Sequence, residues 1–263
     1  MEDHFLESIK KLDYDKTSSK IRDFILEKVT DAGASGVVIG LSGGVDSSVA
    51  LSLAVTAITN HKVLGLLMPY TGITPQADMD DAESLAKELG IEYRIVEINE
   101  IHSRYMSDLI SSKVPEGNLR ARIRMSIIYY HANLMNRLVL GTGDKSEALL
   151  GYFTKYGDGG VALLPIADLY KTQVRELAKK LKVSTSIIDK KSSPQLWHNH
   201  DAEEEIGFPY SAVDQILHAI YDKNMSQEAT AKELGININQ VQHIQRMNAN
   251  SKHKMSMPEI CRL

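Results

Sequence analysis

The 263-residue chain has almost no cysteine and no long hydrophobic run. Cys261 is the single cysteine, so an intramolecular disulfide and a cysteine-ligated zinc or iron–sulfur cluster are excluded. This scarcity favours a reducing, cytoplasmic compartment. The longest apolar runs, at 36–41 and 63–68, fall far short of the roughly 20 residues that a membrane-spanning helix needs. We therefore expect no membrane partner.

The chain also lacks an excess of positive charge. Lys and Arg number 30 against 34 Asp and Glu, which gives a formal net charge of −4 at pH 7. Nucleic-acid-binding domains usually carry an excess of basic residues, so this balance disfavours nucleic acid as a partner. Hydrophobic residues make up 43% and charged residues 24%, as in ordinary globular proteins. A chain of this length can bury a sizeable core without disulfides.

Hydrophobic periodicity divides the first two thirds of the chain into alternating strands and helices. Short apolar runs typical of buried strands occur at 37–41, 62–68, 93–98 and 137–140. Helical spacing occurs at 18–30, 49–58, 76–89 and 118–136. Strands that alternate with helical crossovers predict an α/β fold, a doubly wound parallel sheet with helices on both faces.

Beyond about residue 170 the pattern predicts helices alone. They are expected at 171–181, 210–222, 226–234 and 237–249. We expect a single domain over 1–263. It would consist of an α/β core over about 18–170 and a helical extension over about 171–263.

The sharpest motif is Ser-Gly-Gly-Val-Asp-Ser-Ser at 42–48, between a predicted strand and a predicted helix. Its glycines allow a tight turn and close approach of a phosphate, and the helix N-terminus offers unpaired N–H donors. The Gly-Lys-Ser/Thr of a lysine P-loop and the Gly-x-Gly-x-x-Gly of a dinucleotide fingerprint are both absent. The motif resembles the pyrophosphate loop of the N-type ATP pyrophosphatases, which cleave ATP between the α- and β-phosphates. A plain Ser/Gly turn is the alternative.

Two further motifs follow the fourth predicted strand. The segment 141–147 lies at the carboxyl end of that strand, where open parallel sheets bind ligands. Glu147 in this segment can complete a magnesium site with Asp46, because Mg²⁺ prefers one or two carboxylates plus phosphate oxygens. The alternative for 141–147 is a capping Asp144 and a surface Glu. The segment 151–160 is rich in glycine and aromatic residues, as suits a loop that packs a base or a ring.

Together these motifs resemble the ammonia-dependent NAD synthetases over about residues 18–258. The likeness also rests on the segments 117–125, 168–174, 201–207 and 253–254. The resemblance implies an adenine nucleotide alpha hydrolase-like fold and a ligase that forms a C–N bond. ATP would adenylate the carboxylate of nicotinic acid adenine dinucleotide (deamido-NAD), and ammonia would then displace AMP to give NAD.

The resemblance also implies Mg²⁺ as a cofactor, ATP as co-substrate and roles for individual residues. Asp46 and Glu147 would hold Mg²⁺, and with Lys171, placed on the phosphates, they form the implied catalytic set. The residues that would contact ATP are Gly40, Leu41, Ser42, Gly43, Gly44, Val45, Asp46, Ser47, Thr142, Lys171 and Ser193. Those that would contact deamido-NAD are Arg122, Lys155, His253 and Lys254. The partners would be small molecules and a second subunit, in a homodimer built around the 118–136 helix.

The sequence departs from the family pattern at three places, all outside the ATP-binding residues. Ala162 stands where the family usually has an acid, His-Asn-His at 198–200 replaces Glu-Gly-Gln, and Met255 replaces an arginine. The acceptor is therefore less specified than the ATP chemistry. An amidating or adenylating relative with another carboxylate acceptor stays open, as does an ATP-binding module without catalysis. Retention of both Asp46 and Glu147 favours catalysis.

Two other patterns have structural explanations. His198, His200 and Asp201 have the residue types of a metal site, but lack a convincing fourth ligand, so we expect a solvated loop there. The segment 226–247 has helix-turn-helix spacing, but its two basic and two acidic residues cancel. A helix that enters a DNA groove normally brings an excess of Lys and Arg. We therefore predict a structural helical hairpin.

Overall fold

The computed structural model describes residues 2–256 and 258–262 and contains a four-stranded, all-parallel sheet. The strands are β1 (Val37–Gly40), β2 (Val63–Leu67), β3 (Glu92–Ile95) and β4 (Leu138–Leu140), in the order β3-β2-β1-β4. Val37 pairs with Val63 on one side and with Leu138 on the other. The four predicted strands and the parallel sheet are thus confirmed. The third strand is shorter than predicted, because it ends at Ile95 on the exposed edge of the sheet.

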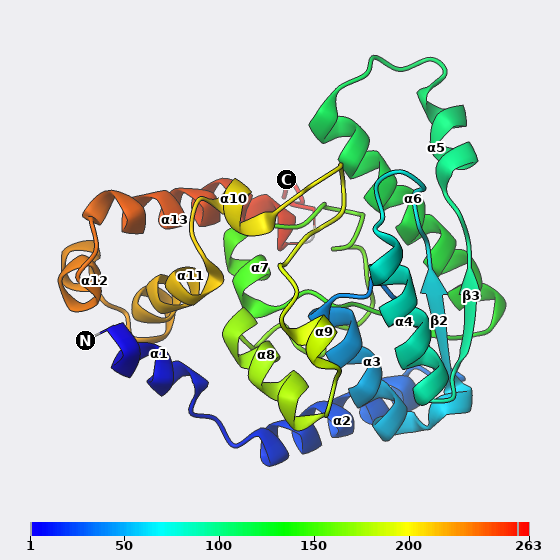
Figure 1. The fold of residues 1–263 in the computed structure, drawn as a ribbon, viewed down its shortest axis with the longest axis horizontal. Helices are drawn as coiled ribbons and strands as arrows, with labels where there is room; N and C mark the ends of the chain where they lie inside the picture. The colour runs from blue at the N-terminus through cyan, green and yellow to red at the C-terminus, as the bar shows by residue number, and fades with distance from the viewer. Residues whose placement is uncertain (1, 257, 263) are drawn as a thin grey trace.

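Helices cover both faces of this sheet (Figure 1), as predicted. One face carries α2 (Tyr14–Asp31), α3 (Val45–Ile58) and α4 (Gln76–Glu88), with α8 (Lys171–Lys180) packed on α3. The other face carries α6 (Lys113–Leu134), beside α5 (Asn99–Met106). The chain changes face between β3 and β4. Ligands bind at such a switch point, outside the carboxyl ends of the strands.

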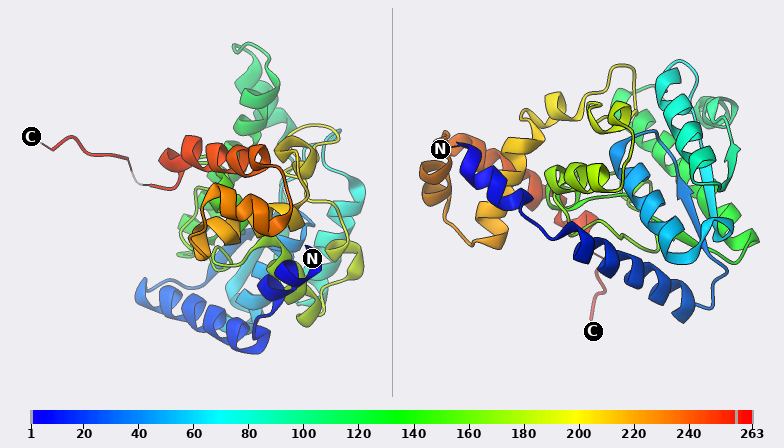
Figure 2. Two further views of the ribbon diagram at one scale, coloured as in Figure 1. Left: turned by 90° about the vertical axis from the view of Figure 1, so that its left-hand side faces the viewer. Right: turned by 60° about the horizontal axis from the view of Figure 1, so that its bottom comes forward.

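A second group of helices packs beside the sheet layers. It comprises α7 (Lys145–Leu150), α10 (Ala202–Ile206), α11 (Tyr210–Leu217), the π-helical turn η2 (His218–Asp222), α12 (Gln227–Leu234), α13 (Ile238–Ser251) and the 3₁₀ turn η3 (Lys252–Lys254). The short helix α9 (Thr185–Ile188) packs with α8 in the core beneath the sheet, and a 3₁₀ turn η1 (Asn60–Lys62) precedes β2. The N-terminal helix α1 (Glu2–Lys10) lies against α11 and α8, whereas the C-terminal residues 258–262 extend away from the body of the molecule (Figure 2). The helices α1, α5, α7, α9 and α10 were not predicted. Apart from α1 and α5 they are too short for helical periodicity to show.

The predicted helical hairpin is confirmed in α12 and α13. Ser226 caps α12 by accepting the backbone N–H of Ala229, and Gly235 ends the helix with a φ of +64°. Val241 and Ile244 of α13 are fully buried. The apolar spacing therefore serves packing between helices. Over the described residues, none of the helices has both the length and the apolar content that crossing a bilayer requires.

Candidate active site

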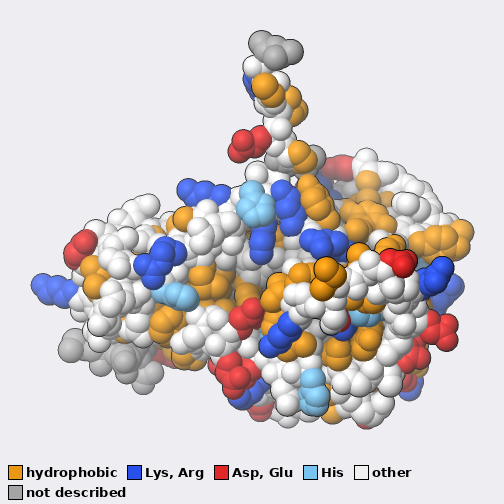
Figure 3. All heavy atoms as spheres, turned by 90° about the horizontal axis from the view of Figure 1, so that it is seen from above, with side chains coloured by type: hydrophobic (Ala, Val, Ile, Leu, Met, Phe, Trp, Pro, Cys, Tyr) orange, Lys and Arg blue, Asp and Glu red, His pale blue; other side chains and the backbone are white. Residues whose placement is uncertain are grey.

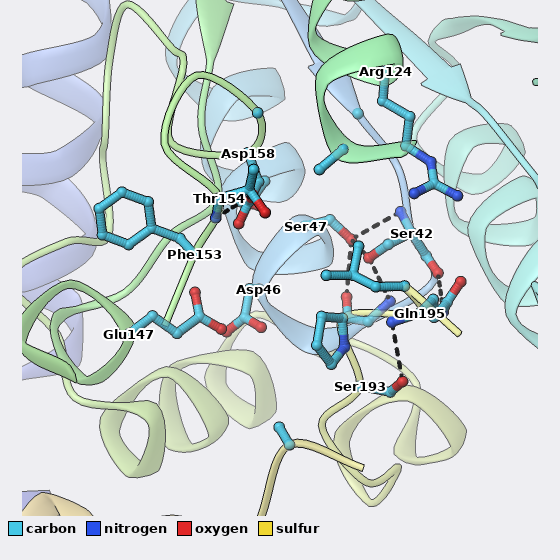
Figure 4. Close-up of a pocket in the computed structure, with 18 of the residues that line it drawn as sticks. Ser42, Asp46, Ser47, Arg124, Glu147, Phe153, Thr154, Asp158, Ser193 and Gln195 are labelled. Atoms are coloured by element: carbon cyan, nitrogen blue, oxygen red, sulfur yellow. Dashed lines mark hydrogen bonds between the residues drawn. The ribbon is translucent and has the colours of Figure 1, made fainter. Parts of the chain in front are cut away.

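The predicted phosphate loop turns sharply from β1 into α3. Gly43 has a φ of +73°, and a Cβ there would lie 2.1 Å from the carbonyl oxygen of Asp78, so only glycine fits. Ser47 Oγ donates to the Gly44 carbonyl at 3.1 Å and lies 3.1 Å from Ser42 Oγ, as Figure 4 shows. The loop leaves the N-terminus of α3 facing an open cavity. This arrangement suits an anion.

The cavity has a volume of about 420 Å³ and lies at the carboxyl ends of β1 and β4. Of the eight positions from 40 to 47, all except Gly43 line it, and so do Thr142 and Ser193. The structure therefore brings together residues that the sequence placed on ATP from three distant segments. Asp158, Thr154 and Arg124 also line the cavity, and Figure 4 shows them around the same space.

Lys171 is buried beneath the cavity and is not one of the residues that line it, unlike the other residues outside 40–47 that the sequence placed on ATP. Its ammonium group is 2.7 Å from Asp46 Oδ2, 2.9 Å from Glu147 Oε1 and 3.0 Å from Asp144 Oδ2. The first two contacts are aligned hydrogen bonds, and the third is an ion pair without that alignment. The side chain is 1% exposed. The predicted catalytic set of Asp46, Glu147 and Lys171 is thus one cluster, with Asp144 as a fourth member.

Opposing effects set the protonation of this cluster. Burial by itself would lower the pKa of Lys171, but the three carboxylates outweigh it and hold that pKa well above its usual value. Burial raises the pKa of Asp144 and of Glu147, while Lys171 acts in the other direction. Glu147 keeps 22% of its side chain open to the cavity, where water moderates the effect. The lysine is therefore a permanent cation that keeps closely spaced carboxylates together.

Sequence reasoning assigned Asp144 only a capping role. It does cap α7, because its Oδ1 accepts the Glu147 backbone N–H at 2.8 Å. Its other oxygen faces Lys171, and the residue is fully buried. In the sequence, the only indication that Asp144 pairs with Lys171 is its position three residues before Glu147. That position predicts a cap, but a cap does not require a buried carboxylate.

The carboxylates of Asp46 and Glu147 fit a magnesium site. Figure 4 shows the two side chains pointing toward one another at the edge of the cavity. Asp46 Oδ1 is buried and has no hydrogen-bond partner among the described residues, so it can accept a ligand. The part of the chain that the structure describes holds no group of three or more His, Cys, Asp or Glu suited to a metal. A pair of carboxylates fits Mg²⁺ that arrives with phosphate oxygens.

The four residues implied for the acceptor gather around the 151–155 segment. Arg122 donates from Nε and Nη2 to the Lys155 carbonyl, each at 3.3 Å. Lys155 Nζ in turn donates to the carbonyl of His253. Lys254 Nζ donates to the carbonyls of Gly151 and Phe153, at 2.7 and 2.9 Å. Of the four, Lys254 lines the cavity. Figure 3 shows basic and histidine side chains gathered on this face near the C-terminal tail.

Ala162, the first departure from the family pattern, is exposed. It does not belong to the cavity lining, which includes its neighbour Val161. Asp158, four residues earlier, does line the cavity, and its Oδ1 accepts the Thr154 backbone N–H at 2.8 Å. The chain therefore has a carboxylate, that of Asp158, four residues before the position at which the family usually has an acid and this chain has Ala162.

The solvated loop expected at 198–201 is wrong for His200. This residue is 5% exposed and stacks on Trp197, with ring centroids 3.5 Å apart. Its Nε2 lies 2.7 Å from Glu205 Oε2 and 3.2 Å from the Tyr152 hydroxyl. Burial lowers the pKa of His200. Trp197 and Glu205 are near His200 in the chain, and Tyr152 comes from a distant segment; together they bury the imidazole.

Sequence reasoning also missed a clamp over the phosphate loop. Lys190 Nζ donates to the Gly43 carbonyl at 3.1 Å, to Asp81 Oδ2 at 2.8 Å and to Asp78. Gln195 Nε2 donates to Asp78 Oδ2 at 2.6 Å. These bonds hold the polar segment 190–195 against the loop. In the sequence this segment carries no periodic signal, and the resemblance singled out only Ser193 within it.

Comparisons with known proteins agree with this geometry. Residues 17–258 match the NAD synthase family. The chain is 46% identical over 258 residues to the NH₃-dependent NAD⁺ synthetase of Staphylothermus marinus, covering 97% of this chain and 94% of that protein. A solved NH₃-dependent NAD synthetase from Campylobacter jejuni is similar with a TM-score of 0.82 and 35% identity, over 95% of this chain and all of that one. An NMN synthetase from Francisella tularensis is similar with a TM-score of 0.84 and 32% identity, over 96% and 100%.

Proposed function

The chain belongs to the NAD synthase family, and from this premise we propose that its cavity converts deamido-NAD to NAD with ATP and ammonia. The nicotinate carboxylate oxygen attacks the α-phosphorus of ATP, and pyrophosphate leaves with the bond electrons. Ammonia then attacks the carbonyl carbon of the mixed anhydride, AMP leaves, and the nitrogen loses its extra proton. Adenylation is needed because a bare carboxylate is a poor electrophile.

The observation that carries this proposal is the phosphate loop beside the Lys171 cluster. The loop offers the N-terminus of α3 and the hydroxyls of Ser42 and Ser47 to the phosphates. Asp46 is part of both features, because it lies in the first turn of α3 and bonds Lys171. Preorganised charges that meet developing negative charge stabilise the transition state without reorganisation.

Asp46 and Glu147 would hold Mg²⁺, which when bound neutralises charge on the leaving pyrophosphate. The two side chains meet the requirement of the ion for a small number of hard oxygen ligands. Lys171 holds both carboxylates in place through one oxygen each, at 2.7 and 2.9 Å. Lys171 itself does not line the cavity, so its proposed effect on ATP acts through these two carboxylates, which do line it.

Arg122, Lys155, His253 and Lys254 would contact the acceptor. Three of them present charge-bearing side chains that bond only backbone carbonyls among the described residues. A carbonyl carries no net charge, so these cations remain available to an anionic dinucleotide. The acceptor would thus lie against the 151–155 segment and η3, which are hydrogen-bonded to each other.

We also propose that the protein acts as a homodimer in the cytoplasm. The family resemblance centres the dimer on α6, and this helix exposes Tyr130 and Leu134 by 65% and 66%. Large exposed apolar side chains on one helix favour contact with a partner. The exposed thiol of Cys261 suits a reducing compartment.

The test supplies the protein with magnesium ATP, ammonium and deamido-NAD. We expect AMP, pyrophosphate and NAD, whereas ADP and orthophosphate would contradict the proposal. Glutamine, freed of contaminating ammonia, should not replace ammonium, because a glutaminase needs its own nucleophile and Cys261 is exposed near the end of the chain. Efficient turnover with glutamine would show that the nitrogen donor is misassigned.

A second acceptor belongs in the same experiment. The similarity to the Francisella protein, described as an NMN synthetase, and the loss of the acid at Ala162 favour nicotinic acid mononucleotide as the alternative. Both acceptors have the same carboxylate, so adenylation is unchanged. The ratio of kcat/KM for the dinucleotide and the mononucleotide decides between them.

A further inference from the structure

Asp214 of α11 is fully buried beside the Lys171 cluster. Its side chain forms no hydrogen bond with the side chains of Asp46, Glu147 or Lys171. Its Oδ1 accepts the hydroxyl of Ser146 at 2.5 Å, and its Oδ2 accepts the backbone N–H of Thr172 at 2.8 Å. Ser146 belongs to α7 and Thr172 to the first turn of α8. A single carboxylate thus joins three helices.

Ser146 extends this connection to the backbone of Lys171. Its Oγ accepts the Lys171 N–H at 2.9 Å while its hydroxyl hydrogen goes to Asp214. The first two backbone N–H groups of α8 are therefore bonded by side chains from α7 and α11. Those N–H groups have no partner within their own helix, and because they are buried they would be unpaired without Ser146 and Asp214. Ser146 also immediately precedes Glu147.

We propose that Asp214 is a positioning residue that fixes Lys171 relative to Glu147 and Asp46. This inference rests on the proposed function, because it concerns the same reaction. Both partners of Asp214 are donors, so the ionised form, with two accepting oxygens, is the form that positions Lys171. The charge of that form faces the N-terminus of α8, where the helix dipole favours it. Lys171 and the two proposed magnesium ligands then keep their spacing when the substrate enters.

Asp214→Asn is the most direct test because it preserves shape and removes one acceptor. An amide has one oxygen and one NH₂ group, so either Thr172 N–H or the Ser146 hydroxyl is left without an acceptor. The α8 terminus should shift relative to α7. Asp214 makes no hydrogen bond to the phosphate loop between β1 and α3, so binding of ATP in the ground state should persist.

Asp222 provides a matched control. It joins the same two helices to the end of α11, because it accepts from Lys145 Nζ at 2.8 Å and from the Tyr170 hydroxyl at 2.9 Å. Asp222 accepts hydrogen bonds from side chains only, and it makes none with the backbone of Lys171 or Ser146. Asp222→Asn should therefore affect stability with little effect on turnover.

We expect Asp214→Asn to lower kcat about 10- to 100-fold, while the KM for ATP stays within about twofold, as a misplaced group predicts. Ser146→Ala, a smaller change that serves if Asp214→Asn does not fold, should lower kcat in the same way. The double variant should be no worse than the more damaged single variant, because the two residues act as one unit. Asp222→Asn should keep its kcat within about twofold of wild type.

Hydrogen exchange supplies a readout that does not depend on activity. The amides of Lys171 and Thr172 should lose protection in Asp214→Asn and keep it in Asp222→Asn. Equal kcat in wild type and Asp214→Asn, or equal losses in the two Asn variants, would overturn the inference. If wild type forms no AMP, the proposed function fails, while the exchange pattern still reports whether Asp214 fixes the start of α8.

Discussion

The proposed ATP side and the proposed acceptor side of the site balance their charges in different ways. On the ATP side, Lys171 is 1% exposed and pairs with three carboxylates. On the acceptor side, Lys155 and Lys254 bond backbone carbonyls. Arg122 is exposed and also bonds a carbonyl. The cation of the first set is paired with carboxylates before any ligand arrives, whereas the cations of the second set have no carboxylate partner among the described residues.

This difference suits the two proposed regions to different tasks: the paired Lys171 fixes geometry, and the cations on carbonyls bind an anionic ligand. A buried lysine among carboxylates cannot move without leaving a charge unpaired, so it defines fixed geometry at a high energetic cost of disruption. Cations on carbonyls exchange partners more easily and attract an anionic ligand. Substitutions should therefore damage turnover on the ATP side and binding on the acceptor side.

The largest effect is expected for Asp46→Asn and Glu147→Gln. Each removes an anionic oxygen while keeping shape, and each leaves Lys171 with fewer counter-charges. We expect turnover to fall by on the order of 4 kcal/mol in transition-state stabilisation, roughly a thousandfold. Steady-state AMP formation measures it, with circular dichroism as the control for folding. Near-wild-type rates at saturating magnesium would mean that these residues do not hold the metal.

The second effect is a pH dependence of stability on the ATP side. Burial raises the pKa of Asp214 from its ordinary 3.8 to about 7, so the folded protein holds this proton more tightly than the unfolded chain. The stabilisation is complete below about pH 4 and is lost as pH rises through about 7.

Urea unfolding of wild type and Asp214→Asn at several pH values isolates this contribution. Between about pH 4 and pH 7, wild type should lose on the order of 3 kcal/mol relative to the variant. A difference between the two proteins that does not vary with pH would show that Asp214 titrates normally.

The third effect concerns the phosphate loop. Gly43→Ala places a Cβ 2.1 Å from the Asp78 carbonyl and strains a φ of +73°. We expect kcat/KM for ATP to fall about 100-fold, since the loop must move away from the phosphates. Gly207→Ala is the matched control, because its φ is +87° but a Cβ there meets nothing within 4 Å. Equal effects of the two substitutions would attribute the loss to backbone strain alone.

On the acceptor side, Arg122→Ala should raise the KM for deamido-NAD about tenfold, the value of one charge-assisted hydrogen bond. The KM for ATP should not change. Arg94→Ala is the control, because Arg94 is also exposed but pairs with Glu92 on the far edge of the sheet. If the KM for ATP rises instead, Arg122 contacts ATP and its assignment to deamido-NAD is wrong.

The smallest effect is expected for Ala162→Asp, which restores the acid of the family pattern. We expect the KM for deamido-NAD to fall by about threefold, since Ala162 is exposed and water already competes for the contact. The KM for ATP should stay constant. If the KM for ATP shifts and that for the dinucleotide does not, residue 162 does not face the acceptor.

The sequence alone was sufficient for the features that depend on neighbouring residues. Apolar runs such as Val37–Gly40 predicted the strands, because a strand buried on both faces needs continuous hydrophobic residues. The Ser-Gly-Gly turn predicted the phosphate loop, because a strand, a glycine with positive φ and a helix N-terminus are contiguous in the chain. The short helices α7 and α10 were missed because too few residues show a period.

Only the tertiary structure decided which polar side chains are buried together. By residue type alone, Lys171, Asp144, Asp214 and His200 would each be expected to be solvated, and the family resemblance that singled out Lys171 did not indicate its burial. Folding brings Lys171 to carboxylates that lie 24 to 125 residues away along the chain. The desolvation of one charge is acceptable only where its counter-charges converge from other elements, and that convergence is a property of the packed helices rather than of any local pattern.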